Sequence, residues 1–298
     1  MPQHREFLTR FVRHPLEAVG AFVFYWLFRA LPLDWASGLA GRLARTVGPR
    51  LKVSGRAERN LKRAYPEKDA AEIAAIIGGM WENLGRVAGE YPHLQRLRAG
   101  GTADRLEIIG AEFIDQLRDD GKPGIFLMAH LGNWEFSGLA SGQRDLAVDR
   151  VYRQANNRLT EWLFRQGRAS VDGALIPKGP AGAKQLLQSL NAGNHLALLV
   201  DQKMNDGIAV PFFGRDAMTA PAIAQLALRM DCPVVPVRVK RLTGARFQVI
   251  ALPPMEFTPT GDRNADVLAF MTRVNAIIED WVRETPEQWL WLHNRWPD

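Results

Sequence analysis

The segment GIFLMAHLGNWEFSG, residues 124–138, constrains the fold of this chain most strongly. A hydrophobic run, interpreted as a buried strand, stops at His130, and Glu135 follows at the start of a predicted helix. Between them, Gly132 and Asn133 tolerate the tight or left-handed backbone of a turn. The pattern predicts an imidazole and a carboxylate at the carboxyl end of a strand, where open α/β sheets usually hold ligands.

The spacing of His130 and Glu135 requires that turn. On one helix the two side chains would lie about 140° apart, and on one straight strand about 16 Å apart on opposite faces. Brought together by a turn, the carboxylate can bond one imidazole nitrogen and leave the other as a general base. We expect catalysis, specifically an acyl-transfer site; a structural or capping histidine is the alternative.

The rest of the chain alternates strand and helix patterns, which predicts an α/β fold with a mainly parallel central sheet covered by helices on both faces. The expected strands are 106–110, 124–129, 149–153, 174–177, 195–201, 233–240 and 246–252. The expected helices are 69–98, 111–119, 156–168, 180–192 and 220–230. The division expected is an N-terminal helical region, residues 1–100, and an α/β core, residues 101–298.

The N-terminal region contains the most apolar stretch, which predicts a membrane-associating helix over about residues 15–33. Its uninterrupted part, Ala18 to Phe28, is shorter than the roughly 20 residues that span a bilayer. Trp26 and Trp35 suit the headgroup region, so we expect an anchor that lies in or dips into the cytoplasmic leaflet. A buried core helix is the alternative.

Positive charge gathers just after that stretch. The net charge is +6, and residues 42–63 hold eight cations against the one acid Glu58. Each cation near an anionic bilayer contributes about 1 kcal/mol, so we expect an anionic membrane surface as partner. No nucleic-acid partner is expected, because the chain has no nucleic-acid-binding motif. A solvated helix face is the alternative. The one cysteine, Cys232, excludes an internal disulfide and a Cys-based zinc site.

Polar residues follow two other predicted strands and are expected to bind substrate, for instance phosphate or sugar oxygens. They are Arg153, Asn156, Arg165, Arg168, Asp201 and Gln202. The loop after Gln202, with Phe212 and Phe213, is interpreted as an apolar lip beside the site. No nucleophilic-serine elbow, phosphate loop or zinc pair is present, which favours direct attack by a substrate hydroxyl on an activated acyl group.

Several ordered blocks resemble one family over nearly the whole chain. They are RNLKRAYPE (59–67), HLGNWE (130–135), DQ (201–202), VPFFGRDAMT (210–219), CPVVPVRVKR (232–241) and PEQWLWLHNRW (286–296). The family is that of the late acyltransferases of lipid A biosynthesis, the lauroyl and myristoyl transferases, related to the wider lysophospholipid acyltransferases.

The resemblance implies a glycerolipid-acyltransferase-like enzyme that moves a fatty acyl chain from acyl carrier protein to a hydroxyl of a lipid A precursor. By position, His130 would be the base, Glu135 its partner, and Arg168 or Arg165 the essential arginine. No metal and no cofactor are implied, since acyl-acyl carrier protein is the co-substrate. The implied location is the inner membrane, held peripherally or by a single helix anchor, with the catalytic domain facing the cytoplasm.

The chain departs from those members of the family that end in a basic HxRWK, because it has HNRWPD instead. It also has Glu135 where the glycerolipid branch usually has Asp, which favours lipid A over glycerol phosphate acceptors. Two alternatives stay open. One is an enzyme of the same fold acting on another glycolipid or lysophospholipid, and the other is a non-enzymatic lipid-binding protein.

Overall fold

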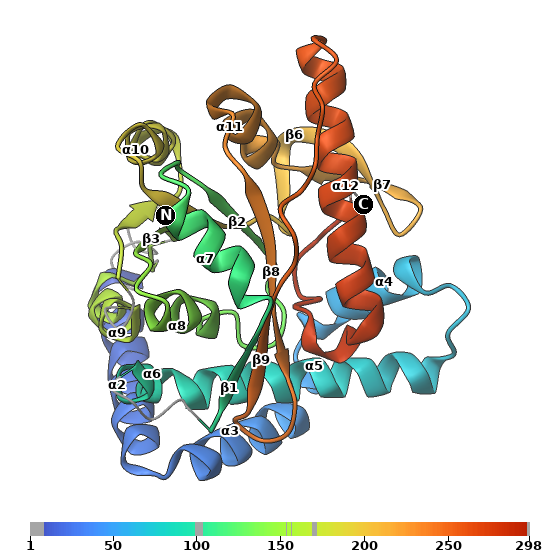
Figure 1. Ribbon diagram of the computed structural model, residues 1–298. Coiled ribbons are helices and arrows are strands. Elements are labelled where there is room, and N and C mark those ends of the chain that lie inside the picture. Colours follow the sequence, from blue (N-terminus) through green and yellow to red (C-terminus); the bar gives the residue numbers. More distant parts are fainter. Residues whose placement is uncertain (1–8, 99–103, 153, 156, 169–171, 297–298) are drawn as a thin grey trace.

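A computed structural model of the protein describes residues 9–98, 104–152, 154–155, 157–168 and 172–296. Its centre is a sheet in the order β1-β9-β8-β2-β5-β3-β4, with helices on both faces (Figure 1). The strands are β1 (Leu106–Ile109), β2 (Ile125–Met128), β3 (Val148–Tyr152), β4 (Leu175–Pro177), β5 (His195–Leu199), β8 (Val234–Arg241) and β9 (Phe247–Ala251). Among these described strands the β8–β9 pair is antiparallel and the other pairs are parallel. The predicted fold class is confirmed.

Every predicted strand and helix of the α/β region is present. The helices there are α7 (Ala111–Asp119), α8 (Phe136–Gln143), α9 (Arg158–Arg168), α10 (Pro180–Asn191) and α11 (Ala222–Met230). All four residues of β2 are buried, because this strand lies in the interior of a sheet with helices on both faces.

Three of the described strands and α-helices of the α/β region are not predicted by the sequence patterns. They are α12 (Arg263–Glu284) and an antiparallel hairpin of β6 (Lys203–Phe212) and β7 (Arg215–Thr219). Phe213 and Gly214 form the hairpin turn, both with positive φ (52° and 67°), as a two-residue turn of this kind requires.

The predicted apolar lip in this segment is wrong. Phe212 is 1% exposed and Phe213 is 6% exposed, so the two rings belong to the core. Phe212 stacks on Trp296, and the backbone N–H of Phe213 donates to Glu279 of α12. The hairpin therefore fastens α12 and the C-terminal segment together instead of opening beside a site.

Helices make up the described chain before the sheet. They are η1 (Thr9–Arg13), α2 (His14–Ala30), α3 (Leu33–Val47), η2 (Gly48–Arg50), α4 (Ser54–Ala64), α5 (Ala70–Glu90), η3 (Tyr91–His93) and α6 (Leu94–Arg98); a last short helix, η4 (Pro286–Gln288), precedes the C-terminal segment. The single helix predicted over residues 69–98 is divided into α5, η3 and α6. Asp69 and Glu72 form a capping box at the start of α5. Residues of α4 and α5 share one core cluster with β2 and β5, and the division into two domains stays a prediction.

Small residues let α3 lie against α5. A Cβ added at Gly85 of α5 would stand 2.4 Å from the carbonyl oxygen of Ala40, and one at Gly89 would stand 2.6 Å from that of Ala36. Glycine is therefore required at both positions of α5. The opposite face of α3 exposes large hydrophobic side chains at every fourth position: Trp35, Leu39, Leu43 and Val47.

A buried ion pair joins α5, β8 and the turn after β2. Glu90 is fully buried, and its carboxylate accepts hydrogen bonds from both terminal nitrogens of Arg241. It also accepts one from Asn133 Nδ2 at 2.7 Å and one from Ser37 Oγ at 2.7 Å. Nε of Arg241 donates to Asn83 Oδ1 at 2.8 Å. Every charge in this network has a partner, so it fixes the turn that holds Asn133.

Arg241→Met is expected to lower the free energy of unfolding by about 3–5 kcal/mol, because it leaves the Glu90 carboxylate buried without its cation. Denaturant unfolding followed by tryptophan fluorescence measures this. Lys62→Ala, which breaks the exposed Lys62–Glu58 pair, is the control and should cost less than about 1 kcal/mol. Equal losses in the two variants would show that the Glu90 network does not stabilise the fold.

Candidate active site

The register of two parallel strands places His130 beside Asp201. Met128 of β2 pairs with Leu199 of β5, and the next two residues of each strand lead to His130 and Asp201. Nδ1 of His130 lies 2.8 Å from Oδ1 of Asp201, and the backbone N–H of His130 donates to Oδ2 at 2.8 Å. Trp289 Nε1 donates to the same Oδ2 at 2.8 Å. The imidazole is thus held at the carboxyl end of the sheet by a carboxylate from the neighbouring strand.

Asp201 is charged at neutral pH in spite of its burial. It is 3% exposed, and burial raises its pKa, but the attraction of His130 and the hydrogen bonds from His130 and Trp289 lower the pKa to about 2. A carboxylate can only accept, so Nδ1 of His130 carries the proton that is shared with Asp201. The Nε2 atom of His130 therefore has a free lone pair in the neutral ring, as a general base needs.

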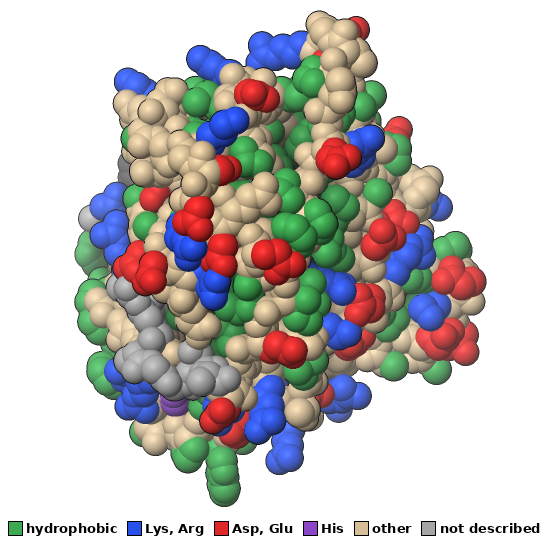
Figure 2. Space-filling model, viewed as in Figure 1, with side chains coloured by type: hydrophobic (Ala, Val, Ile, Leu, Met, Phe, Trp, Pro, Cys, Tyr) green, Lys and Arg blue, Asp and Glu red, His purple; other side chains and the backbone are tan. Residues whose placement is uncertain are grey.

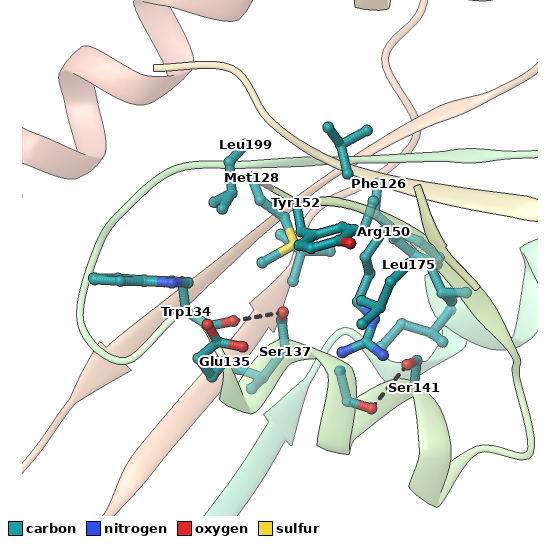
Figure 3. A pocket seen from close by; sticks show the side chains of 17 residues that line it. Phe126, Met128, Trp134, Glu135, Ser137, Ser141, Arg150, Tyr152, Leu175 and Leu199 are labelled. Carbon is teal, nitrogen blue, oxygen red and sulfur yellow. Dashed lines mark hydrogen bonds between the residues drawn. The ribbon is translucent and has the colours of Figure 1, made fainter. Parts of the chain in front are cut away.

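The expectation that Glu135 holds the imidazole is wrong, because Asp201 occupies that position. Glu135 stands at the start of α8, where its backbone N–H donates to Oδ1 of Asn133. Its side chain lies in the wall of a pocket next to Trp134 (Figure 3). The turn does bring Glu135 back to the carboxyl end of the sheet, but its side chain lines the pocket instead of contacting Nδ1 of His130.

That pocket lies between the sheet and α8, and its lining residues surround about 740 Å³ of space, part of which is open to solvent (Figure 3). Most of its wall is apolar, including Phe126, Met128, Leu175 and Leu199. The ring of Trp134 lines the pocket and also contacts the His130 ring edge to face, with 5.0 Å between centroids. The pocket is therefore one aromatic ring away from the imidazole.

The C-terminal segment after η4 forms another wall of the site. Trp289 bridges Leu131 in antiparallel fashion, and the backbone N–H of Leu290 donates to the carbonyl of His130. Gly132 has φ 58°, and a Cβ there would stand 2.3 Å from the carbonyl oxygen of Val239. Only glycine fits this close approach of the turn to β8.

Gln202 and His293 complete the polar cluster. Nε2 of Gln202 lies 3.3 Å from Nε2 of His130 and 3.0 Å from Nε2 of His293. Burial and the nearby His130 lower the pKa of His293, against the opposing effect of Asp201. His293 is not among the site residues that the sequence predicts. Its place in the block PEQWLWLHNRW is the signal that could have found it.

The other predicted substrate-binding residues have different outcomes. Asp201 and Gln202 lie next to His130, as described above. Arg165 is on the exposed side of α9, where a hydrogen bond with Tyr152 and the charge of Glu161 raise its pKa. Tyr152 lines the pocket, which places Arg165 near the pocket rim. Arg153, Asn156 and the side chain of Arg168 lie outside the described residues.

Taken together, the fold and the site define a class of α/β protein in which the carboxyl end of a mainly parallel sheet holds an oriented imidazole beside an apolar pocket. The family described as bacterial lipid A biosynthesis acyltransferase matches residues 6–298. The chain belongs to this family and is an acyltransferase of the lipid A biosynthesis type. The resemblance seen in its sequence blocks is confirmed.

Several curated proteins are similar to this chain over most of its length. A lipid A biosynthesis acyltransferase of Haemophilus influenzae is 25% identical over 284 residues, covering 91% of this chain and 84% of the relative. The lipid A biosynthesis lauroyltransferase of Escherichia coli K12 is 27% identical over 279 residues, covering 91% and 88%. A phosphatidylinositol mannoside acyltransferase of Mycolicibacterium smegmatis is 23% identical over 280 residues, covering 91% and 88%.

A solved structure is similar to the chain at a low level. The crystal structure of the 1-acyl-sn-glycerophosphate acyltransferase PlsC from Thermotoga maritima has a TM-score of 0.42 and 11% identity, covering 84% of this chain and 96% of that chain. A likeness at this level supports no conclusion about the chain. The parallel sheet and its helices are established by the strand pairing itself.

Proposed function

We propose that the enzyme moves a fatty acyl chain from the thioester of acyl carrier protein to a hydroxyl of a lipid A precursor, with no covalent enzyme intermediate. The observation that carries this proposal is the His130 imidazole, held at Nδ1 by buried Asp201 and separated from an apolar pocket only by Trp134. An imidazole fixed in this tautomer is suited to take a proton from an alcohol.

In this mechanism Nε2 of His130 removes the proton of the acceptor hydroxyl, and the oxygen attacks the thioester carbonyl. The tetrahedral intermediate collapses, the carbon–sulfur bond breaks, and the thiolate takes the proton from Nε2. Asp201 holds the ring and stabilises the imidazolium that forms between these steps. An ester and a free thiol are the products.

Glu135 keeps a proposed catalytic role, but a different one from holding the ring. Its carboxylate is in the pocket wall beside Trp134, so it would act on the substrate near the reacting carbonyl. Arg165, Arg168, Arg153 and Asn156 are proposed to bind the phosphate and sugar oxygens of the acceptor, for which guanidinium groups are well suited.

Asp201→Asn is expected to lower kcat by about 10²- to 10⁴-fold, because an amide cannot hold Nδ1–H of His130 as a carboxylate does. His130→Ala should lose at least as much, and Glu135→Gln about 10-fold. The assay incubates purified enzyme with acyl-acyl carrier protein and a tetra-acylated lipid A precursor, followed by mass analysis.

Two results would contradict the assignment. Wild-type turnover by His130→Ala would exclude the base. A larger loss in Glu135→Gln than in Asp201→Asn would make Glu135 the orienting group. Arg229→Ala, an exposed residue of α11 away from the site, is the matched control and should keep wild-type kcat.

The pocket is proposed to hold the fatty acyl chain. Successive residues of β5 alternate between the two faces of the sheet, so Ala197 and Leu199 line the pocket while Leu196 and Leu198 face the other core cluster. Each methylene buried there contributes about 0.8 kcal/mol, roughly a fourfold gain in binding. Pocket depth would then set the preferred chain length.

Ala197→Leu is expected to shift the preference toward shorter acyl chains, because the added methyl groups fill part of the pocket. Competition between acyl-acyl carrier proteins of several lengths, read by product mass, measures the shift. Leu198→Met, on the opposite face of the same strand, is the control and should keep the wild-type preference. An unchanged preference in Ala197→Leu would show that the chain does not enter this pocket.

The enzyme is proposed to lie on the inner membrane, facing the cytoplasm. The helices within the described residues are all too short or too polar to cross a bilayer.

Hydrophobic side chains are nevertheless exposed on adjacent elements. They are Val19, Val23, Trp26 and Leu27 of α2, Trp35, Leu39, Leu43 and Val47 of α3, and Leu159 and Trp162 of α9. Phe22 of α2 stacks on Trp162 of α9, so these faces are continuous. Figure 2 shows hydrophobic side chains at the left and lower edges, over α2 and α3. Such a surface suits a protein lying in the headgroup region.

Acyl carrier protein, which is acidic, is proposed to dock on the basic surface of α4. That helix borders the active site directly, because Asn60 Nδ2 donates to the carbonyl of Trp291 at 2.8 Å and Arg56 to that of Leu292 at 3.1 Å. Arg59 and Lys52 are exposed on the same surface. A thioester delivered there would arrive next to His293 and His130.

Arg59→Glu is expected to raise KM for acyl-acyl carrier protein about 5- to 50-fold at low salt, with kcat nearly unchanged, because opposite charges steer association. KM should depend less on ionic strength in the variant. Arg229→Glu, an exposed cation on α11, is the control. An unchanged KM, or an equal rise with an acyl-pantetheine donor, would place the docking surface elsewhere.

Another glycolipid acceptor is the second candidate, favoured by the similarity to the phosphatidylinositol mannoside acyltransferase. The site would work in the same way, because the proposed mechanism needs only a hydroxyl group within reach of Nε2 of His130. Supplying both acceptor classes in one competition assay separates the candidates.

A further inference from the structure

The amide of Gln202 stands between two imidazoles. Its Nε2 atom is 3.3 Å from Nε2 of His130 and 3.0 Å from Nε2 of His293. An amide NH₂ group has two hydrogens and no lone pair to offer, so each of the two contacts needs an acceptor.

The protonation of the ring nitrogens agrees with this arrangement. Because Nδ1–H of His130 is bound to ionised Asp201, its Nε2 is an acceptor whenever the ring is neutral. His293 then accepts the second hydrogen at its own Nε2, so its ring is neutral too, with the proton on Nδ1. Both hydrogens of the Gln202 amide are used.

The Gln202 amide, where it contacts His130, occupies the position that the hydroxyl of the lipid substrate must take. A hydroxyl that gives its proton to Nε2 has to lie within about 3 Å of that atom, so it must displace the Gln202 amide. The bond to His293 is independent of His130 and can persist. One N–H of Gln202 is then released within a few ångströms of the reacting carbon, while the other keeps the amide in place.

We infer that His293 is a positioning residue that retains the Gln202 amide, so that its released N–H donates to the oxyanion of the tetrahedral intermediate. This inference rests on the proposed function. As the hydroxyl oxygen forms its bond to the carbonyl carbon, its proton moves to Nε2 of His130 and the carbonyl π electrons move to oxygen. The negative oxygen accepts the bond from Gln202, and this bond lasts until the thiolate leaves.

The role of His293 needs its neutral form. Burial lowers its pKa from the ordinary value of 6.5, and so do the nearby His130, Arg56 and Lys178, while the charge of Asp201 acts in the opposite direction. His293 is therefore an acceptor at pH 7 and above. As pH falls through its lowered pKa, the ring gains a proton at Nε2 and can no longer accept from Gln202.

The test is a double-mutant cycle on kcat with acyl-acyl carrier protein and the lipid A precursor. Gln202→Ala is expected to lose about 10²- to 10³-fold, as for removal of one oxyanion donor. His293→Ala should lose about 10-fold or more, and the double variant no more than Gln202→Ala alone, because His293 acts through Gln202. His293→Gln should restore most of the loss, since its carbonyl oxygen can accept the same bond, and should remove the acid limb that His293 contributes to the pH profile.

The controls separate this inference from folding and from the proposed function. His195→Gln changes another buried histidine, at the opposite end of β5, and should leave kcat unchanged. Wild-type kcat in His293→Ala, or additive losses in the double variant, would overturn the role of His293 while leaving His130 as base. Full activity of His130→Ala, or no transfer by the wild type, would remove the proposed function and this inference with it.

Discussion

The parallel pairing of β2 with β5 is the constraint on which the site depends. It sets residues 71 apart in the sequence opposite each other, and the first polar residues beyond both strands are His130 and Asp201. The backbone N–H of His130 and the indole of Trp289 bond the same carboxylate, which offsets the cost of its burial. Sheet register, which is fixed by buried apolar side chains, therefore also fixes the tautomer of the imidazole.

Segments from both ends of the chain hold the turn that follows His130. Glu90 at the end of α5 binds Asn133 of the turn and Ser37 of α3. On the other side, the carbonyl of Gln288 accepts from Gly132. The helix α3, whose exposed apolar face is proposed to lie on the membrane, is therefore connected to the turn after His130 by two hydrogen bonds, Ser37 to Glu90 and Asn133 to Glu90.

The sequence predicts the strand-turn-helix around His130 correctly because those signals are local: an apolar run, a glycine and an amide. It assigns the wrong carboxylate to the imidazole because the choice between Glu135 and Asp201 depends on which strands are neighbours, and hydrophobic patterns do not encode strand order. His293 is missed for a similar reason. Its short segment has no periodicity, and only the bridge between Trp289 and Leu131 brings it to the sheet.

Trp134 and Gln202 lie on two different sides of His130, one facing the apolar pocket and the other facing the polar cluster. The indole of Trp134 faces the apolar pocket, so an acyl chain held there would place its carbonyl at the edge of the His130 ring. Gln202 and His293 lie at Nε2, on the polar side where α4 borders the C-terminal segment. In the proposed mechanism the acyl chain lies on the Trp134 side and the attacking hydroxyl lies at Nε2, so that the hydroxyl, the base and the carbonyl can meet without an enzyme-bound intermediate.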